Sequence, residues 1–181
     1  MATDTFPLGL DDTASNSVYF KNKSIYPHKI IRFNFTTYDM RRGTDIVKPE
    51  GPRCNIMLLA DGSDPSNHHF LYARVLGAYH ANVMYSGPGM QGFETRSLHF
   101  LWVRWYEVVD PESSGWNNST LDTVRFPPMH EDTSFGFVDP NDVLRGCHIL
   151  PAFAKGKRTA NINVSRCAKD SKDYLLYYVG R

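Results

Sequence analysis

The side chains that could do chemistry do not form a known catalytic motif. The nucleophile elbow G-x-S-x-G, the phosphate-binding loop G-x-x-x-x-G-K-[ST] and the zinc-binding motif H-E-x-x-H are all absent. Residues 87–92 have the glycine spacing of a dinucleotide-binding loop, but Pro88 and the lack of a following helical pattern argue against that function. His130, beside Glu131 and Asp132, could act in acid–base catalysis, although such a loop cluster is more often solvated surface. We therefore expect a binding protein, with a nucleic-acid-processing enzyme as the alternative.

The histidines and cysteines also lack the spacing of a metal site. The chain has seven histidines and three cysteines, spread along its length. Cys147, His148 and Cys167 with one further histidine could supply zinc ligands, but the paired C-x-x-C spacing is missing. An odd number of distant cysteines argues against a disulfide framework as well. We expect no metal, no cofactor and a reducing compartment, and hence a nuclear or cytoplasmic location.

Aromatic side chains are concentrated in two apolar runs of the sequence. Tyr72, Trp102, Trp105 and Tyr106 could form a cage that holds a methylated ammonium group by cation–π attraction, with Glu107 or Asp110 beside it. Aromatic residues that alternate along a strand also commonly pack the core. These four residues therefore have two interpretations, a ligand-binding cage or ordinary core packing.

The C-terminal stretch is basic, although the whole chain has a formal net charge of +1. A charged partner must therefore be met by a local patch. The candidate phosphate-binding residues are Lys155, Lys157, Arg158, Arg166, Lys169 and Lys172. They face only Asp170 and Asp173, and they are interleaved with small polar residues that suit contacts with a nucleic-acid backbone. A solvated tail is the alternative interpretation.

These candidate residues must be positioned by strands, of which residues 98–109 form the most apolar. This run predicts a central strand because it is rich in aromatic and β-branched residues. Alternation places the even positions from Phe100 to Val108 on one face and the odd positions from His99 to Val109 on the other. Both faces are mostly apolar, so we expect the strand to be covered on both sides.

The remaining pattern predicts a mainly β fold, a small antiparallel barrel or bent sheet with one or two short helical turns. Further strands are expected at residues 29–38, 56–60, 70–85, 121–126, 147–153 and 174–179. Asp139 as N-cap and Pro140 at the first helical position predict one helical turn that ends before Gly146.

Composition divides the chain into three parts. Residues 1–27 are expected to be a flexible segment, residues 28–154 a β-barrel-like domain, and residues 155–181 a basic segment that ends in a short strand. Because that last strand ends abruptly, we expect either that the chain is a fragment or that the strand needs a partner, which an oligomer could supply. No run is long and apolar enough to span a bilayer, so no membrane partner is expected.

Three segments resemble the signature blocks of bromo-adjacent homology (BAH) domains. They are Leu-Tyr-Ala-Arg-Val-Leu-Gly at 71–77, Leu-Trp-Val-Arg-Trp-Tyr at 101–106 and Asp-Val-Leu-Arg-Gly-Cys-His-Ile-Leu-Pro at 142–151. The resemblance covers roughly residues 29–153 and implies a small BAH-type β module that engages chromatin. Where that family usually has Arg-Pro after its second block, this chain has Glu107 and Val108.

A second resemblance is to the C-terminal region of proteins from fungal Plavaka-like transposable elements. It rests on residues 100–109, 136–153 and 164–174. It implies a transposon-derived origin but no chemistry, because the transposase core of such elements lies outside this region. We therefore expect a non-catalytic interaction module for chromatin, for protein such as a histone, or for nucleic acid. The alternative is a fragment or scaffold domain of a larger transposase-like protein.

Overall fold

The computed structural model describes residues 18–60, 68–86, 94–109, 121–158 and 165–180. The turn expected after Ala60 and the glycine-rich run at 87–92 lie outside these residues. The described chain divides into two compact units. The first holds the described parts of Met1–Tyr26 and His80–His99, and the second those of Pro27–Tyr79 and Phe100–Arg181.

The described residues are organised mainly by β-strands, as the sequence predicted. The strands are β1 (Val18–His28), β2 (Ile31–Thr36), β3 (Arg42–Val47), β4 (Asn55–Leu59), β5 (Phe70–Tyr85), β6 (Thr95–Val108), β7 (Thr123–Arg125), β8 (Phe135–Val138), β9 (Val143–Pro151) and β10 (Tyr177–Gly180). The helical pieces are three-residue 3₁₀ turns at Asp132–Ser134, Pro140–Asp142, Phe153–Lys155 and Asp170–Lys172. No helix in the described residues has the length and apolar composition that a membrane crossing requires.

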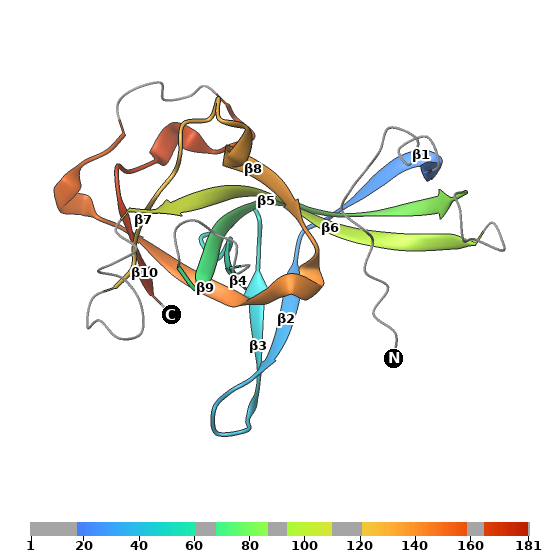
Figure 1. The fold of residues 1–181 in the computed structure, drawn as a ribbon, viewed down its shortest axis with the longest axis horizontal. Coiled ribbons are helices and arrows are strands. Elements are labelled where there is room, and N and C mark those ends of the chain that lie inside the picture. Colours follow the sequence, from blue (N-terminus) through green and yellow to red (C-terminus); the bar gives the residue numbers. More distant parts are fainter. Residues whose placement is uncertain (1–17, 61–67, 87–93, 110–120, 159–164, 181) are drawn as a thin grey trace. The chain divides into compact units, whose positions relative to one another are not determined.

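The strand pairings make a barrel-like ring. One sheet has the order β1-β5-β4-β9-β10-β7-β6-β8, and β5 also pairs with β6, so the strands from β5 round to β6 return to their start. The ring is not evenly closed, because β6 and β7 pair only at Glu107 with Arg125 and at Val108 with Val124. β2 and β3 form a separate two-stranded ribbon (Figure 1).

The central strand β6 packs against two apolar clusters. The first cluster is Phe33, Val47, Ile56, Leu58, Ala73, Val75, Ala78, Leu101, Val103, Val138 and Val143. The second cluster is Met57, Tyr72, Tyr106, Val124, Phe126, Cys147, Tyr177 and Val179. Leu101 and Val103 lie in the first cluster and Tyr106 in the second. β6 is therefore covered on both faces from Leu101 to Tyr106, whereas its first five residues, Thr95–His99, are exposed.

Three strands lie where the sequence predicted none. β1 begins at Val18, inside the segment expected to be flexible, and all of its residues except Ser24 are exposed. β3 alternates exposed with less exposed residues because one face of the ribbon lies against β9. Backbone pairing rather than an apolar run defines β1 and β3, and β8 has only four residues.

The predicted helical turn is present but shorter than expected. The Asp139 side chain accepts a hydrogen bond from the Asn141 backbone N–H at 2.8 Å, as expected of an N-cap. The turn ends at Asp142, and β9 begins at Val143 rather than at Cys147. The strand starts early because its first residues pair with β4, for example Val143 with Leu58.

The C-terminal segment is built into the ring. β10, the short strand expected at the end of the chain, pairs with β9 on one side and β7 on the other. Tyr177 lies opposite Pro151 on β9 and opposite Val124 on β7. The partner strand that the last segment was expected to need is therefore supplied within the chain.

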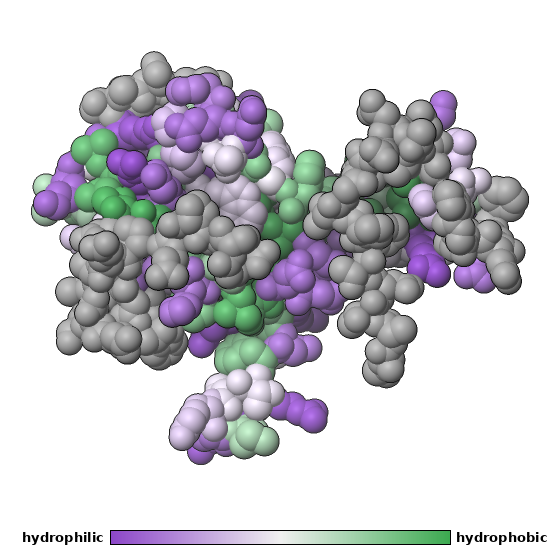
Figure 2. Space-filling model, viewed as in Figure 1, coloured by the Kyte–Doolittle hydropathy of each residue, from purple (hydrophilic) through white to green (hydrophobic). Residues whose placement is uncertain are grey.

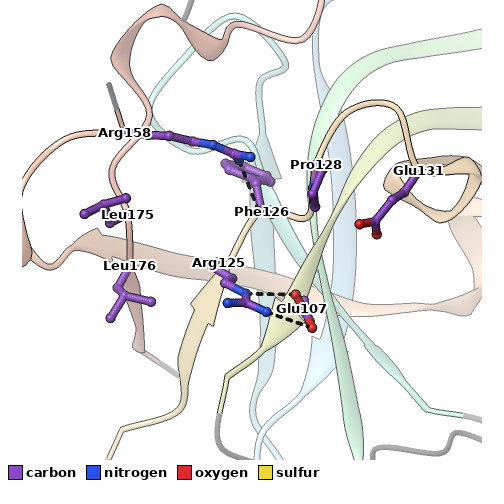
Figure 3. A pocket seen from close by; sticks show the side chains of 8 residues that line it. All are labelled: Glu107, Arg125, Phe126, Pro128, Glu131, Arg158, Leu175 and Leu176. Atoms are coloured by element: carbon purple, nitrogen blue, oxygen red, sulfur yellow. Dashed lines mark hydrogen bonds and ion pairs between the residues drawn. The ribbon is translucent and has the colours of Figure 1, made fainter. Parts of the chain in front are cut away.

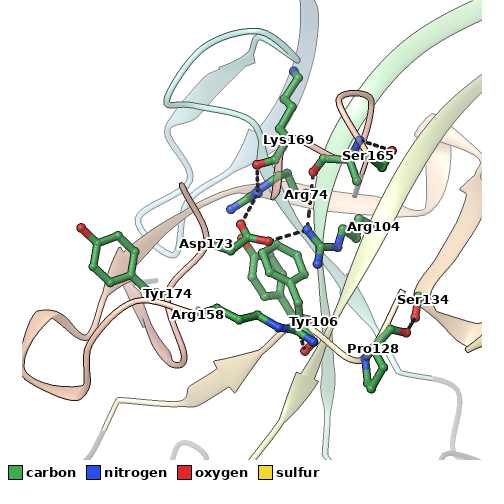
Figure 4. Close-up of polar contacts among 12 residues, drawn as sticks. Arg74, Arg104, Tyr106, Pro128, Ser134, Arg158, Ser165, Lys169, Asp173 and Tyr174 are labelled. Carbon is green, nitrogen blue, oxygen red and sulfur yellow. Dashed lines mark hydrogen bonds and ion pairs between the residues drawn. The ribbon is translucent and has the colours of Figure 1, made fainter. Parts of the chain in front are cut away.

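A buried charge cluster attaches this segment to β5 and β6 (Figure 4). The two carboxylate oxygens of Asp173 accept hydrogen bonds from Arg74 at 2.9 Å and from Arg104 at 2.6 Å. The same two guanidinium groups lie 4.4 Å and 3.9 Å from the centre of the Phe126 ring. Tyr177 donates a third bond to Asp173 at 3.2 Å. Three segments distant in sequence are thus held at one carboxylate.

The surroundings keep Arg74 and Tyr177 in the protonation states that the cluster requires. Burial acts to lower the pKa of Arg74, but Tyr106 and Asp173 outweigh it and the net direction is upward. Burial, and then the negative charge of Asp173, raise the pKa of Tyr177. Arg74 therefore stays charged, and the Tyr177 hydroxyl stays protonated and able to donate.

We predict that Asp173→Ala lowers the free energy of unfolding by about 3–5 kcal/mol, because it leaves the buried Arg104 and the partly buried Arg74 without their carboxylate. Urea denaturation followed by circular dichroism measures the change. Glu107→Gln is the control. Its ion pair with Arg125 leaves the two side chains 48% and 52% exposed, and we expect a loss below about 1 kcal/mol. Equal losses in the two variants would show that the cluster does not stabilise the fold.

Candidate nucleic-acid interface

The structure separates the charges of the C-terminal basic segment. Asp170 and Asp173, which are its only carboxylates between residues 153 and 173, are 5% and 3% exposed. The cations that remain exposed are Lys155, Lys157, Arg166 and Lys172. The described surface of this segment therefore carries positive charge, because its negative charges are turned inward.

Two of the six candidate cations have structural partners instead. Arg158 donates from Nη1 to the Phe126 carbonyl at 3.1 Å. Lys169 donates from Nζ to the Pro49 carbonyl, and its own carbonyl lies 3.5 Å from Nη1 of Arg74. These bonds attach the segment to the β3–β4 connection and to the residue that follows β7. The cations best placed to contact phosphate are the four exposed ones, whose ammonium and guanidinium groups suit that contact.

Two of the aromatic candidates are buried in the second cluster. Tyr72 is fully buried and donates to Asp122 at 2.5 Å. Tyr106 donates to Asn55 at 3.2 Å and stacks on Phe126 with the ring centres 4.1 Å apart. Burial also raises the pKa of Tyr106, so the phenol stays neutral. These two rings serve the core.

The two tryptophans point to opposite faces of β6. Trp102 is half-buried, and its ring centre lies 6.3 Å from that of Phe135. Trp105 is half-buried against the first cluster, and its indole nitrogen lies over Gly136 so closely that a side chain there would collide with it. The structure therefore distributes the four candidates between different surroundings. The aromatic cage stays a prediction that the arrangement does not support.

Sequence reasoning missed the buried charge cluster of Arg74, Arg104 and Asp173. Its signal was an arginine within each of the two most apolar strands, since a charged residue at such a position must find a partner in the fold. The partner carboxylate lies 99 residues from Arg74 and 69 from Arg104 along the chain. No local pattern could have identified it.

A pocket of about 470 Å³ opens beside the C-terminal segment (Figure 3). It is lined by Glu107, Arg125, Phe126, Pro128, Glu131, Arg158, Leu175 and Leu176. The two oxygens of Glu107 accept from Arg125 at 2.9 Å and 3.3 Å. This bond is the main cause that raises the pKa of Arg125. The lining contains no histidine, and one of its two carboxylates is held in an ion pair, so the pocket lacks a free acid–base pair.

The cysteines are placed as separate thiols. Cys54 and Cys147 are buried, and Cys167 is exposed. Burial raises the pKa of Cys147 to about 12 and also raises that of Cys54. Among the described residues, no group of three or more His, Cys, Asp or Glu side chains is placed to hold a metal ion. The structure does not assemble Cys147, His148 and Cys167 into a site.

A scan against protein-family models gave no match, and searches of curated proteins and of solved structures gave none either. The resemblances to BAH domains and to Plavaka-like proteins therefore stay predictions.

We predict that a thiol reagent modifies Cys167 rapidly in the folded protein, and that Cys54 and Cys147 react only after unfolding. Both thiols are buried, and their raised pKa values keep them protonated through neutral and mildly alkaline pH. Ellman's reagent with and without denaturant measures this. Cys167→Ser should remove the rapid phase, and a rapid phase that survives this substitution would contradict the placement of the other two.

Proposed function

We propose that this chain is a non-catalytic interaction module that binds nucleic acid through the basic surface of its C-terminal segment. One observation carries the proposal: the carboxylates of the segment are buried, whereas Lys155, Lys157, Arg166 and Lys172 are exposed. Cations that neutralise phosphates release the condensed counterions of the nucleic acid, which supplies affinity without sequence preference. The net charge of the whole chain is too small to attract nucleic acid, but a surface on which the cations are exposed and the carboxylates are buried attracts it locally.

The pocket beside Glu107 favours binding over catalysis, because its lining contains no histidine and Glu107 is held by Arg125. An enzyme acting by acid–base chemistry needs such groups to converge on one concave site.

The sequence resemblances support the same proposal. BAH domains are chromatin modules, and the Plavaka-like resemblance implies a transposon-derived protein, so both suggest a partner of the nucleus. A nuclear or cytoplasmic location belongs to this proposal. So does the alternative that the chain is a scaffold domain of a larger transposase-like protein. A scaffold domain would bind protein, and its affinity for nucleic acid would be negligible.

We predict that the purified chain binds a fluorescein-labelled DNA duplex at low salt, and that the logarithm of the affinity falls linearly with the logarithm of the salt concentration. Lys155→Ala/Lys172→Ala should reduce the magnitude of this slope by about 2 and weaken binding at least roughly tenfold near physiological salt. Fluorescence anisotropy measures both quantities.

Lys21→Ala/Lys23→Ala provides the matched control, since both lysines are exposed on β1 and lie outside the basic segment. The control should retain the affinity and the slope of the unaltered chain. If the unaltered chain fails to bind at low salt, or if the two double variants behave alike, the C-terminal segment is not a phosphate-binding surface.

A further inference from the structure

The ribbon of β2 and β3 projects from the body of its own unit (Figure 1). Six antiparallel pairs join its strands, from Ile31 with Val47 to Thr36 with Arg42. Phe33 and Val47 are buried in the first core cluster, so the root of the ribbon is part of the core. Tyr38 at the far end has the exposure of a fully solvated side chain, 106%. The ribbon therefore runs from the core into solvent.

One face of the ribbon is fastened to β9. Asp45 accepts a hydrogen bond from the Gly146 backbone N–H at 3.0 Å and pairs with Arg145 at 3.4 Å. The Arg145 guanidinium also lies 4.6 Å from the centre of the Phe35 ring, and that ring covers Gly43. These contacts fix the direction of the ribbon and leave its other face to solvent.

The solvent face of the ribbon carries hydrogen-bonding groups and positive charge. Its side chains, all exposed, are Arg32, Asn34, Thr36, Arg42, Thr44 and Ile46. Thr44 donates to Asn34 across the ribbon at 2.9 Å, which orders the middle of this face. Figure 2 shows the ribbon as a projection that mixes hydrophilic and apolar residues. No carboxylate lies on this face between its two arginines.

At the tip of the ribbon, a hydrogen-bonded turn exposes the side chains of Tyr38 and Met40 to solvent. The Thr37 N–H donates to the Arg41 carbonyl at 2.8 Å, and the Met40 N–H donates to the Thr37 carbonyl at 2.9 Å. Asp39 pairs with Arg41 at 2.9 Å. Met40 is 83% exposed and has a φ of 62°, a left-handed conformation that is unfavourable for any residue with a side chain of this size. The turn thus presents Tyr38 and Met40 outward at a conformational cost.

We propose that this ribbon enters the major groove of duplex DNA, with Arg32 and Arg42 on phosphates or base edges and Tyr38 and Met40 against the bases. The inference rests on the proposed nucleic-acid binding and adds a second contact surface to it. The major groove of B-form DNA is about 12 Å wide and admits a two-stranded ribbon. Apolar side chains at the tip can contact the thymine methyl groups that the major groove displays.

The shape of the groove favours duplex DNA over duplex RNA, because A-form RNA has a deep and narrow major groove that a ribbon cannot read. The ribbon is also linked to the basic segment, because Lys169 donates to the Pro49 carbonyl just after β3.

The test compares two variants by fluorescence anisotropy with a labelled DNA duplex, the matching RNA duplex and vesicles containing phosphatidylserine. Arg32→Ala/Arg42→Ala should weaken DNA binding and reduce the magnitude of the salt slope by about 2. Tyr38→Ser/Met40→Ser should weaken DNA binding at least roughly fivefold while leaving the salt slope unchanged, because the lost contacts are uncharged. Thermal unfolding confirms that both variants fold.

The controls separate this inference from the proposed function. Leu59→Ser removes another exposed apolar side chain, 62% exposed, and should not alter binding. If the unaltered chain binds DNA and both ribbon variants match it, the ribbon inference fails and the basic segment alone is the contact. If the unaltered chain binds no DNA, both proposals fail. Equal binding of the RNA duplex, or binding to vesicles but not to DNA, would overturn the groove assignment.

Discussion

The structure depends on one buried carboxylate between two arginines. Asp173 accepts hydrogen bonds from Arg74 on β5 and Arg104 on β6, and Phe126 covers both guanidinium groups. Two arginines in an apolar interior would repel each other and lose their hydration without this partner. Because Asp173 comes from the C-terminal segment, neutralising the charges also fixes that segment on the ring. The same contacts therefore stabilise the core and fix the position of the last strand.

The same arrangement determines the surface charge. Asp170 and Asp173 are buried, so the basic residues around them are not balanced on the outside. A chain whose formal net charge is +1 thereby acquires a locally positive face. The carboxylate of Asp173 balances the arginines in the interior, and the outer surface is therefore without it. The burial of these two carboxylates thus both stabilises the fold and leaves the cations that we propose to contact phosphate unbalanced. The ribbon adds two exposed arginines from another part of the same unit.

Local sequence pattern predicted the elements that pack. The alternation in residues 98–109 identified β6 and both of its covered faces, because each face contacts an apolar cluster. Asp139 and Pro140 identified the 3₁₀ turn. The strands that the pattern missed were β1, β3 and β8. β1 is exposed almost throughout and the outer face of β3 is polar, so their backbones are paired without the apolar periodicity on which such predictions depend. β8 has only four residues, Phe135–Val138, which is too short to show a period.

The sequence alone determined a mainly β fold, a central apolar strand and a basic C-terminal segment, since these follow from composition and from periods of two residues. Only the tertiary structure decided which charges meet solvent and which aromatic rings are buried. Arg74 and Asp173 are 99 residues apart, and Lys169 and Pro49 are 120 apart. Contacts at such separations depend on how the ring closes and leave no local signal. For the same reason Tyr72 and Tyr106 became core, whereas Tyr38 in a polar turn became the most exposed aromatic of the ribbon.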